Sequence, residues 1–284
     1  MTPRLLPGLA LVAGCWGGGS SDRPLADFTA ARPLAGQTQL TTHIDFGAGT
    51  LRLRPATSGT LYRMQLGYDA ERFEPVAEFD ERGTVVRLGV RGIEDGSSGR
   101  LGRDNPNQTA TIELSAEVEL VLQARMGAVD AVLEMGGLRL AELDISTGAS
   151  RSMVRFGEPN PGDCRRARIQ AGAAELTVEG LGNSGCREIV VEGGVGRATV
   201  DFTGAWPANA TARLNMAIGG VRIVLPEGVG VRLTMDRFLA SFQPSGLTRV
   251  DGSNAYQSAA YDTAERKLEI AVSSTLGGVD VVWR

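Results

Sequence analysis

The sequence predicts an all-β protein: a single-stranded β-solenoid of stacked coils, preceded by an N-terminal antiparallel β segment. Three observations predict this fold class. The middle of the chain repeats every 21 to 24 residues, apolar and charged residues alternate within each repeat, and a glycine recurs at one place in it. A repeat of this length is typical of solenoids, and alternation with a period of two is typical of strands.

The first 37 residues predict export and a lipid anchor. A single arginine and a short apolar run precede Val12-Ala13-Gly14-Cys15, which resembles the lipobox of bacterial lipoproteins. We therefore expect a signal peptide over 1–14 and lipid on Cys15, with an ordinary cleaved signal and an incidental cysteine as the alternative. Residues 15–37 contain a glycine and serine run and predict a flexible tether. This anchor places the protein at the cell envelope, on the periplasmic face of the outer membrane if the host has two membranes.

Residues 38–92 predict the antiparallel segment. Short alternating stretches such as TLYRMQLGYD and TVVRLGVRG are separated by turn residues, as hairpins require. The polar and glycine-rich stretch that follows predicts a linker over 93–109. The solenoid then occupies 110–284.

The repeat is clearest where CRRARIQAGAAELTVEG, from 164, is aligned with CREIVVEGGVGRATVDF, from 186. The alignment has no gap and an offset of 22 residues. Residues of the same kind fall at matching positions: Cys164 with Cys186, Ile169 with Val191, Gly172 with Gly194, Leu176 with Ala198, Thr177 with Thr199, and Val178 with Val200.

Two upstream units fit the same frame. The stretch ISTGASRSMVRF contributes Ile145, Gly148 and Val154 at an offset of 24 residues, and Gly127 lies another 21 residues back. In a parallel stack, equivalent residues lie above one another at a spacing of about 4.8 Å. We expect each glycine to form a tight corner between two strands.

The two cysteines at matching positions predict a disulfide. Adjacent coils bring Cys164 and Cys186 within the Cα separation of about 4.4–6.8 Å that a disulfide needs, and an exported compartment permits its formation. Two reduced thiols in the core are the alternative.

The C-terminal part continues the solenoid with one interruption. MAIGGVRIV and STLGGVDVV share a pattern, which marks Gly219 and Gly277 as further corners and Trp283 as a residue that caps the last coil. Residues 234–266 break the period and predict an excursion that covers an open end, because exposed edges promote aggregation.

The charges favour a solvated surface. Stacking predicts one ladder of Arg151, Glu175 and Arg197, and another of Arg155, Glu179 and Asp201. A glycosidase reading would pair Glu179 with Asp201 as acid and nucleophile. Arg155, however, would hold Glu179 ionised, the wrong state for a general acid. We therefore interpret both ladders as exposed charge pairs.

Composition excludes several other functions. The net charge is -4 without a basic block, so nucleic acid is not an expected partner. His43 is the only histidine, which excludes a histidine metal cluster and leaves no catalytic pairing beyond that residue. The glycines at 47–49 lack the Gly-Lys-Ser/Thr of a phosphate loop. We expect no catalytic residue, cofactor or metal.

The chain also resembles a known family. HIDFGAGTLRLRP followed by LYRMQLGYD resembles the N-terminal segment of the bacterial toast-rack proteins. Residues 110–284, ending in Gly-Gly-Val-Asp-Val-Val-Trp, resemble their repeat domain, which is similar to the C-terminal half of LiaF-type regulators that respond to cell-wall-active antibiotics. The resemblance implies a β-solenoid and no enzymatic activity. The chain differs from LiaF-type regulators in lacking their transmembrane helices.

Three functions follow. The favoured one is a non-catalytic envelope lipoprotein, an interaction or scaffold module that contacts the membrane through Cys15 and binds a protein partner in the envelope. The second is a sensory or inhibitory component of a cell-wall-antibiotic stress response. The third, a polysaccharide-acting solenoid enzyme, has the least support, because no polar groups converge on a concave site.

Overall fold

The computed structural model describes residues 25–80, 84–93, 108–149 and 151–284, and these residues are nearly all-β. The strands are β1 (Ala26–Pro33), β2 (Gln39–Pro55), β3 (Thr60–Tyr68), β4 (Phe73–Phe79), β5 (Val85–Gly92), β6 (Thr109–Leu114), β7 (Glu119–Glu134), β8 (Arg139–Thr147), β9 (Arg151–Arg155), β10 (Arg166–Glu179), β11 (Glu188–Asp201), β12 (Ala210–Leu225), β13 (Gly230–Gln243), β14 (Thr248–Arg249), β15 (Ala255–Gln257) and β16 (Lys267–Trp283). A single short helix, α1 (Leu181–Ser184), is found in this described part.

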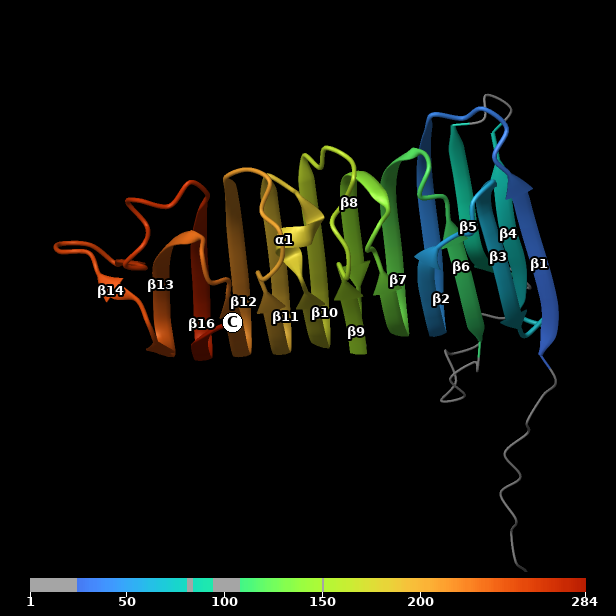
Figure 1. The fold of residues 1–284 in the computed structure, drawn as a ribbon. Coiled ribbons are helices and arrows are strands. Elements are labelled where there is room, and N and C mark those ends of the chain that lie inside the picture. The colour runs from blue at the N-terminus through green and yellow to red at the C-terminus, as the bar shows by residue number, and fades with distance from the viewer. Residues whose placement is uncertain (1–24, 81–83, 94–107, 150) are drawn as a thin grey trace, which may run out of the picture.

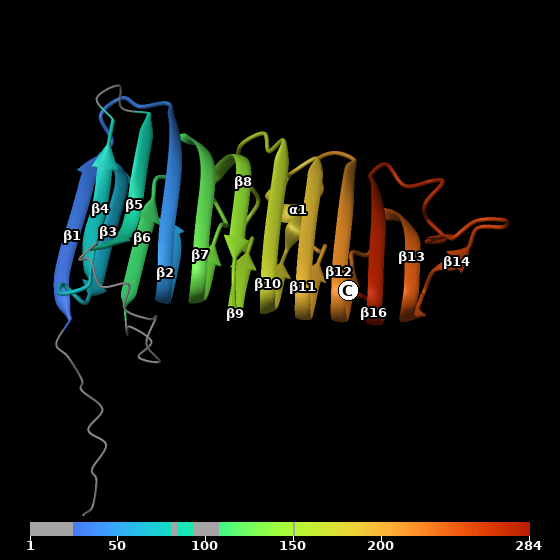
Figure 2. The ribbon, with the colours of Figure 1, turned by 180° about the vertical axis from the view of Figure 1, so that it is seen from behind.

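The strands form one long row, with β1 at one end and β14 at the other (Figures 1 and 2). Their order is β1-β3-β6-β2-β7-β8-β10-β11-β12-β16-β13-β15-β14, and β4, β5 and β9 pair off this path. From β2 to β13, each pair of neighbours in this order is parallel. We call this part the parallel stack.

The observed register is the one that the repeat predicts. Ile169 lies opposite Val191, and Val178 lies opposite Val200. The upstream units also keep their predicted offsets, since Ile145 lies opposite Ile169. The repeat therefore predicted the strand pairing at the level of single residues.

The long strands bend where the glycines stack, and we call this edge of the parallel stack the corner edge; it is the lower edge in Figure 1. Besides Gly196, Gly219 and Gly277, which stack two residues further along the strands, its glycines include Gly47, Gly127, Gly148, Gly172 and Gly194. A Cβ atom on each of the last four would contact the backbone carbonyl of the preceding glycine in this order. Glycine is needed here because the backbones of neighbouring strands approach too closely for a side chain.

The core consists of apolar rows that run along the stack. One row contains a single residue from each long strand: Ile44, Ala124, Ile145, Ile169, Val191, Leu214, Val272 and Met235. Each of these side chains is buried, with at most 5% of its surface exposed. Identical spacing in every strand therefore places apolar side chains on one another, and their burial stabilises the stack.

The N-terminal part differs from its prediction at β2. Within residues 38–92 the antiparallel prediction holds for β4–β5. β3 is also antiparallel to its neighbours, but these are β1 and β6, which lie outside that range. The prediction is wrong for β2, which pairs in parallel with β5, β6 and β7. The reason is that Phe46-Gly47-Ala48 forms a corner directly opposite Met126-Gly127-Ala128, so β2 is the first long strand of the parallel stack.

The predicted tether is also too long. Residues 26–33 form β1, which pairs with β3 over its whole length. Phe28 and Ala30 pack against the core, and this contact explains why the segment is ordered as a strand. The predicted signal peptide over 1–14, the tether residues 15–24 and residues 94–107 of the predicted linker lie outside the described residues.

The strand order at the C-terminal end differs from the order along the chain. Gly219 and Gly277 lie opposite each other, as predicted corners should. However, β16 lies between β12 and β13, so β13 is the outermost long strand. Trp283 therefore does not cap the last coil. Its indole Nε1 donates to the carbonyl of Ser245 at 2.8 Å and so holds the segment that follows β13.

The predicted excursion begins later than expected. Residues 234–243 continue β13, and only the residues beyond them leave the stack. The short hairpin of β14 and β15 pairs with β13 at Arg232–Thr234, and Tyr256 packs against Phe242 with ring centroids 5.0 Å apart. The hairpin therefore covers the beginning of β13.

The corners provide a direct test of the fold. Gly219 has a φ of 136°, and a Cβ there would collide with the carbonyl of Gly196, whereas a Cβ on Gly220 would meet nothing within 4 Å. We expect Gly219→Ala to lower the free energy of unfolding by about 1–3 kcal/mol. The control Gly220→Ala should change it by less than about 0.5 kcal/mol. Urea unfolding followed by circular dichroism measures both, and equal midpoints would contradict this account of the corners.

Candidate functional site

The candidate site is a row of surface residues that runs across the parallel stack. Each residue of the row lies about two positions before its strand reaches the corner edge. Each long strand contributes one polar side chain: Asp45, Arg125, Ser146, Gln170, Glu192, Asn215, Ser273 and Asp236. We call this set the polar row. It directly follows the buried row that begins at Ile44, so the alternation that builds the core also builds this surface.

Hydrogen bonds connect the middle of the polar row. The Ser146 hydroxyl donates to Oε1 of Gln170 at 3.3 Å, and Nε2 of Gln170 donates to Oε2 of Glu192 at 2.5 Å. Arg168, two residues before Gln170 on β10, donates to the same Glu192 oxygen at 3.0 Å. These contacts fix the orientation of three neighbouring polar side chains.

Glu192 carries a fixed negative charge in this network. The hydrogen bond from Arg168 lowers the pKa of the Glu192 carboxyl, and the hydrogen bond from Gln170 acts in the same direction. Partial burial opposes them, and the net direction is downward. The carboxylate is therefore ionised at neutral pH.

A hollow lies beside the N-terminal end of the polar row. Asp45, Arg125 and Ser146 line it together with the corner glycines Gly47 and Gly127, and its volume is about 590 Å³. The glycines leave space that side chains would otherwise fill. An acidic, a basic and a hydroxyl side chain thus reach the hollow from three neighbouring strands.

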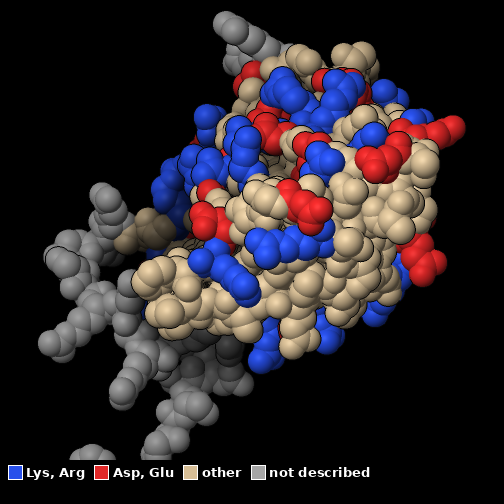
Figure 3. All heavy atoms as spheres, turned by 90° about the vertical axis from the view of Figure 1, so that its left-hand side faces the viewer, with Lys and Arg blue, Asp and Glu red and all other residues tan. Residues whose placement is uncertain are grey.

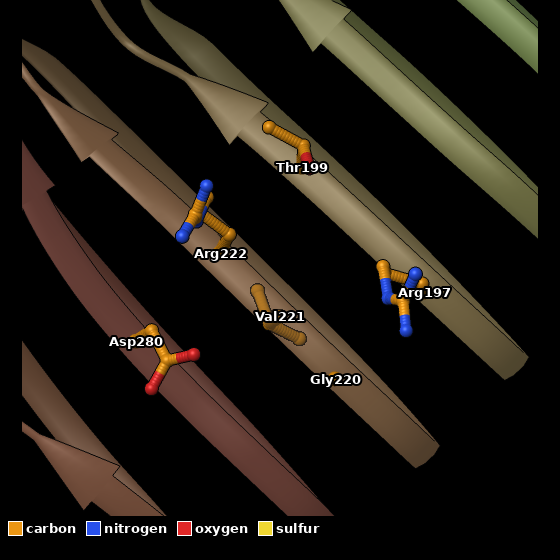
Figure 4. Close-up of a pocket in the computed structure, with 6 residues that line it drawn as sticks. All are labelled: Arg197, Thr199, Gly220, Val221, Arg222 and Asp280. Carbon is orange, nitrogen blue, oxygen red and sulfur yellow. The ribbon is translucent and has the colours of Figure 1, made fainter.

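A second hollow lies on the strand halves that follow the corner (Figure 4). Its volume is about 310 Å³, and its lining residues are Arg197, Thr199, Gly220, Val221, Arg222 and Asp280. Gly220 lies opposite Arg197 and opposite Gly278, so the missing side chains of the two glycines create the hollow. Its charges are mixed, and they come from three neighbouring strands.

Glu179 and Asp201, the two carboxylates of the glycosidase hypothesis, each contact neighbouring groups of the stack. Arg155 binds Glu179 at 2.8 Å and Glu134 at 3.1 Å, and the hydrogen bond to Glu179 raises the pKa of Arg155. Asp201 is buried, accepts a hydrogen bond from the backbone N–H of Thr203 at 2.7 Å and lies 3.9 Å from Arg284. Both carboxylates therefore have structural partners, although the burial of Asp201 was not predicted.

The predicted disulfide is present. Cys164 and Cys186 are bonded, their Cα atoms are 4.3 Å apart, and both side chains are buried. The bond joins the segment before β10 to the segment before β11. Cys15, the predicted lipidation site, lies outside the described residues, so its modification stays a prediction.

His43 is the one histidine of the sequence, and it lies on a strand of the stack. His43 is partly exposed on β2, opposite Arg87 and Gln123. Within the described ranges, no group of three or more His, Cys, Asp or Glu side chains is placed to hold a metal ion.

The parallel stack, its glycine corners and its polar surface rows define a repeat protein with an extended outer surface. Residues 22–179 match the family model described as "N-terminal domain of toast_rack, DUF2154", which is more than half of the chain. The chain belongs to the toast-rack family. Residues 185–281 match a second model, "Cell wall-active antibiotics response LiaF, C-terminal".

Two solved structures can be aligned with most of this chain. A candidate cell adhesion protein from Clostridium sporogenes is 15% identical, with a TM-score of 0.49 over 92% of this chain and 100% of that chain. A candidate adhesin from Bacteroides fragilis is 12% identical, with a TM-score of 0.33 over 89% of this chain and 97% of that chain. No curated protein matches the sequence significantly.

Removing the disulfide should destabilise the stack. The bond closes a loop with a sequence separation of 22 residues, which in the chain-entropy account corresponds to about 3 kcal/mol. We expect the double substitution Cys164→Ala with Cys186→Ala to lower the free energy of unfolding by about this amount in urea titrations. The wild-type protein unfolded with a reductant serves as the control and should approach the variant. Equal midpoints with and without the bond would contradict the prediction.

The Arg168–Glu192 contact should make stability depend on pH in a defined direction. Because the pKa of Glu192 is lowered from 4.5, the contact stabilises the native state fully above that pH and is lost as the pH falls through the lower native value. We expect Arg168→Gln to reduce stability at pH 7 and to have a vanishing effect in strong acid. Arg187→Gln is the control, since its partner Asp163 is highly exposed, and it should have little effect at either pH. Thermal unfolding across the pH range measures both.

Proposed function

We propose that this chain is a non-catalytic bacterial envelope lipoprotein that serves as an interaction or scaffold module at a membrane surface. The observation that carries the proposal is the polar row, which presents one hydrophilic side chain from each of eight strands at regular spacing. Repeat proteins use such extended surfaces to bind protein partners. A protein partner in the envelope is the occupant that we propose for it.

The proposal includes a single-stranded β-solenoid as the architecture of the parallel stack. Its support is the in-register parallel pairing of long strands and the glycines on which these strands bend. Each coil then adds one position to the polar row, so the number of coils sets the length of the binding surface.

The lipid anchor is supported by the sequence. Val12-Ala13-Gly14-Cys15 follows a short apolar run that is preceded by one arginine. In the part of the chain that the structure describes, no helix is long and apolar enough to cross a membrane. We propose that lipid on Cys15 holds the exported protein at the envelope, on the periplasmic face of the outer membrane in a host with two membranes.

A non-catalytic role is supported by the carboxylates that a glycosidase reading would need. Glu179 is held by Arg155, and one Asp201 oxygen accepts a backbone hydrogen bond. Neither is placed as a general acid, which must carry a proton and face a substrate.

A second candidate function is favoured by the match to the LiaF C-terminal model over 185–281. In this function, the chain is a sensory or inhibitory component of the response to cell-wall-active antibiotics. The two functions differ in one outcome: deletion of the gene changes the induction of that response only in the second.

The anchor and the binding surface require separate tests. For the anchor, we expect mass spectrometry of the full chain from the membrane fraction to find diacylglyceryl on Cys15. Cys15→Ser should shift most of the protein from the membrane fraction to the soluble exported fraction. An unmodified Cys15 would contradict the lipoprotein assignment.

For the surface, a crosslinked pull-down from cells compares Glu192→Ala with the control Glu175→Ala. Glu175 is an exposed carboxylate on the strand half after the corner, away from the polar row. We expect the partner captured by the wild type to be reduced several-fold by Glu192→Ala and retained by Glu175→Ala. Equal capture by both variants would contradict binding through the polar row.

A further inference from the structure

The exposed large apolar side chains of this protein are concentrated at the corner edge. In the described part of the chain they are Leu25, Ile93, Val195, Ile218, Phe238, Leu239 and Leu276, with exposed fractions from 37% to 78%. Soluble monomers rarely gather such side chains in one place unless the place is a contact surface.

Four of these residues form a continuous row. Val195 of β11 lies opposite Ile218 of β12, Ile218 lies opposite Leu276 of β16, and Leu276 lies opposite Leu239 of β13. We call these four residues the apolar row. Phe238, the most exposed at 78%, directly precedes Leu239 at the bend of β13.

The apolar row continues toward the N-terminal end with smaller apolar residues. Ala173 of β10 lies opposite Val195 at the same position of the repeat. Ala48 and Ala128 occupy the same place after their corner glycines and lie opposite each other. The corner edge is therefore apolar at this position in several strands, and its large side chains belong to the C-terminal half of the stack.

Figure 3 shows the β14 end of the molecule with the corner edge at the bottom. Uncharged atoms cover much of the lower part of this end, and most of the charged side chains in this view gather above it. The few charges near Phe238 are of both signs, since Asp236 and Arg237 precede it in the sequence and are exposed. The free energy of binding at this surface therefore comes more from burial of apolar area than from net charge.

The chain enters the stack at the same edge. Strand pairing connects the corner of β2 to the start of β1. Thr50, just after that corner, lies opposite Thr109 of β6. Thr109 lies opposite Gly67 of β3, and Gly67 lies opposite Asp27 of β1. Figure 1 shows β1 beginning at the lower edge. Leu25 follows Cys15 by ten positions, and a fully extended chain over that interval spans at most about 35 Å.

We propose that the corner edge is a lipid-contacting edge, on which Phe238 and the apolar row insert between the headgroups of the membrane that holds the anchor. The proposal rests on the proposed lipid anchor at Cys15 for the membrane it names. Two features that are independent of each other, the entry point of the chain and the exposed aliphatic side chains, lie on this one edge. An amphipathic surface element binds a membrane by burying its apolar side at the headgroup boundary.

A second copy of this chain explains the same residues less well. Its natural docking site would be the free edge of β13 beyond Arg232–Thr234, where β15 pairs. That contact would cover Phe238 and Leu239 and leave Val195 and Ile218 exposed, because they lie on β11 and β12. A lipid surface covers residues from all four strands at once.

The lipid contact sets the orientation of the molecule. With the corner edge on the membrane, the two walls of the stack rise from the surface, and the polar row lies along the foot of one wall. The loops at the opposite edge, such as the turn between β12 and β13 that contains Glu227, point away from the membrane.

The test uses the full chain in vesicles of phosphatidylethanolamine and phosphatidylglycerol, with an environment-sensitive fluorophore on a single introduced cysteine. Ile218→Cys places the label on the corner edge, and Glu227→Cys, an exposed position in the turn after β12, is the matched control. The native Cys164 and Cys186 are bonded and buried, so they do not take the label. Lipid blocks the Cys15 thiol in the anchored protein, and where mass spectrometry finds Cys15 unmodified the label is introduced in the Cys15→Ser background. We expect a blue shift and a several-fold rise in emission at 218 and neither change at 227.

The other outcomes are distinguishable. Lipid found on Cys15 by mass spectrometry without a shift at 218 would overturn the lipid-contacting edge and leave the proposed function intact. A shift at 218 with unmodified Cys15 would support the edge and overturn the anchor. A shift that rises with protein concentration in the absence of vesicles would assign the edge to a second copy and overturn the proposal.

A substitution series gives a second measurement. In the Cys15→Ser background, which removes the anchor site, we expect residual co-sedimentation with vesicles. The triple change Ile218→Ser, Phe238→Ser and Leu239→Ser should abolish it, while Glu227→Ser should preserve it. Because all three side chains are exposed, the circular dichroism spectrum should not change. Equal co-sedimentation of both variants would overturn the proposal.

Discussion

The structure depends on the close approach of neighbouring backbones at the corner edge. A Cβ on Gly172 would contact the carbonyl of Gly148, and a Cβ on Gly194 would contact the carbonyl of Gly172. A side chain at any of these positions would push two strands apart and break the hydrogen bonds on both sides of the bend. The glycines therefore fix where β2, β7, β10 and β11 turn, and the distance between successive turns fixes the register of the other positions in these strands. Once the register is fixed, apolar residues stack on apolar residues, and Cys164 meets Cys186.

This dependence explains which parts of the fold are predictable from the sequence. Between Gly127 and Gly194, the glycines, the cysteines and the alternation all carry the same period, so the strand pairing follows at single-residue accuracy. The polar surface of this region follows too, because a known register places the alternating charged residues in rows. Asp201 shows the limit: its position in the ladder was predictable, but its burial depends on the turn at Thr203, which no repeat specifies.

Two features were not predictable because they depend on long-range pairing. The corner of β2 lies 80 positions before that of β7, with β3 to β6 between them, so the period does not extend back to Gly47. At the other end, β16 enters between β12 and β13. The shared patterns around Gly219 and Gly277 mark two neighbouring strands, yet they say nothing of the side on which β13 lies. Repeats define which strands are alike, whereas the order of strands in space depends on which edge is still free when each one forms.

The same corner constraint separates the two kinds of surface on this protein. On the walls, strand alternation sends every second residue outward, and most of these residues are hydrophilic, with contacts such as the one between Gln170 and Glu192. At the bend, alternation is interrupted, and the residue that follows a corner points outward without a place in the core. Soluble walls and a soluble edge would both favour polar residues there. Val195, Ile218, Leu276 and Leu239 are instead large and aliphatic at this one position. Their exposure therefore requires a cause outside the fold, and a surface that covers the edge of four adjacent strands at once supplies it.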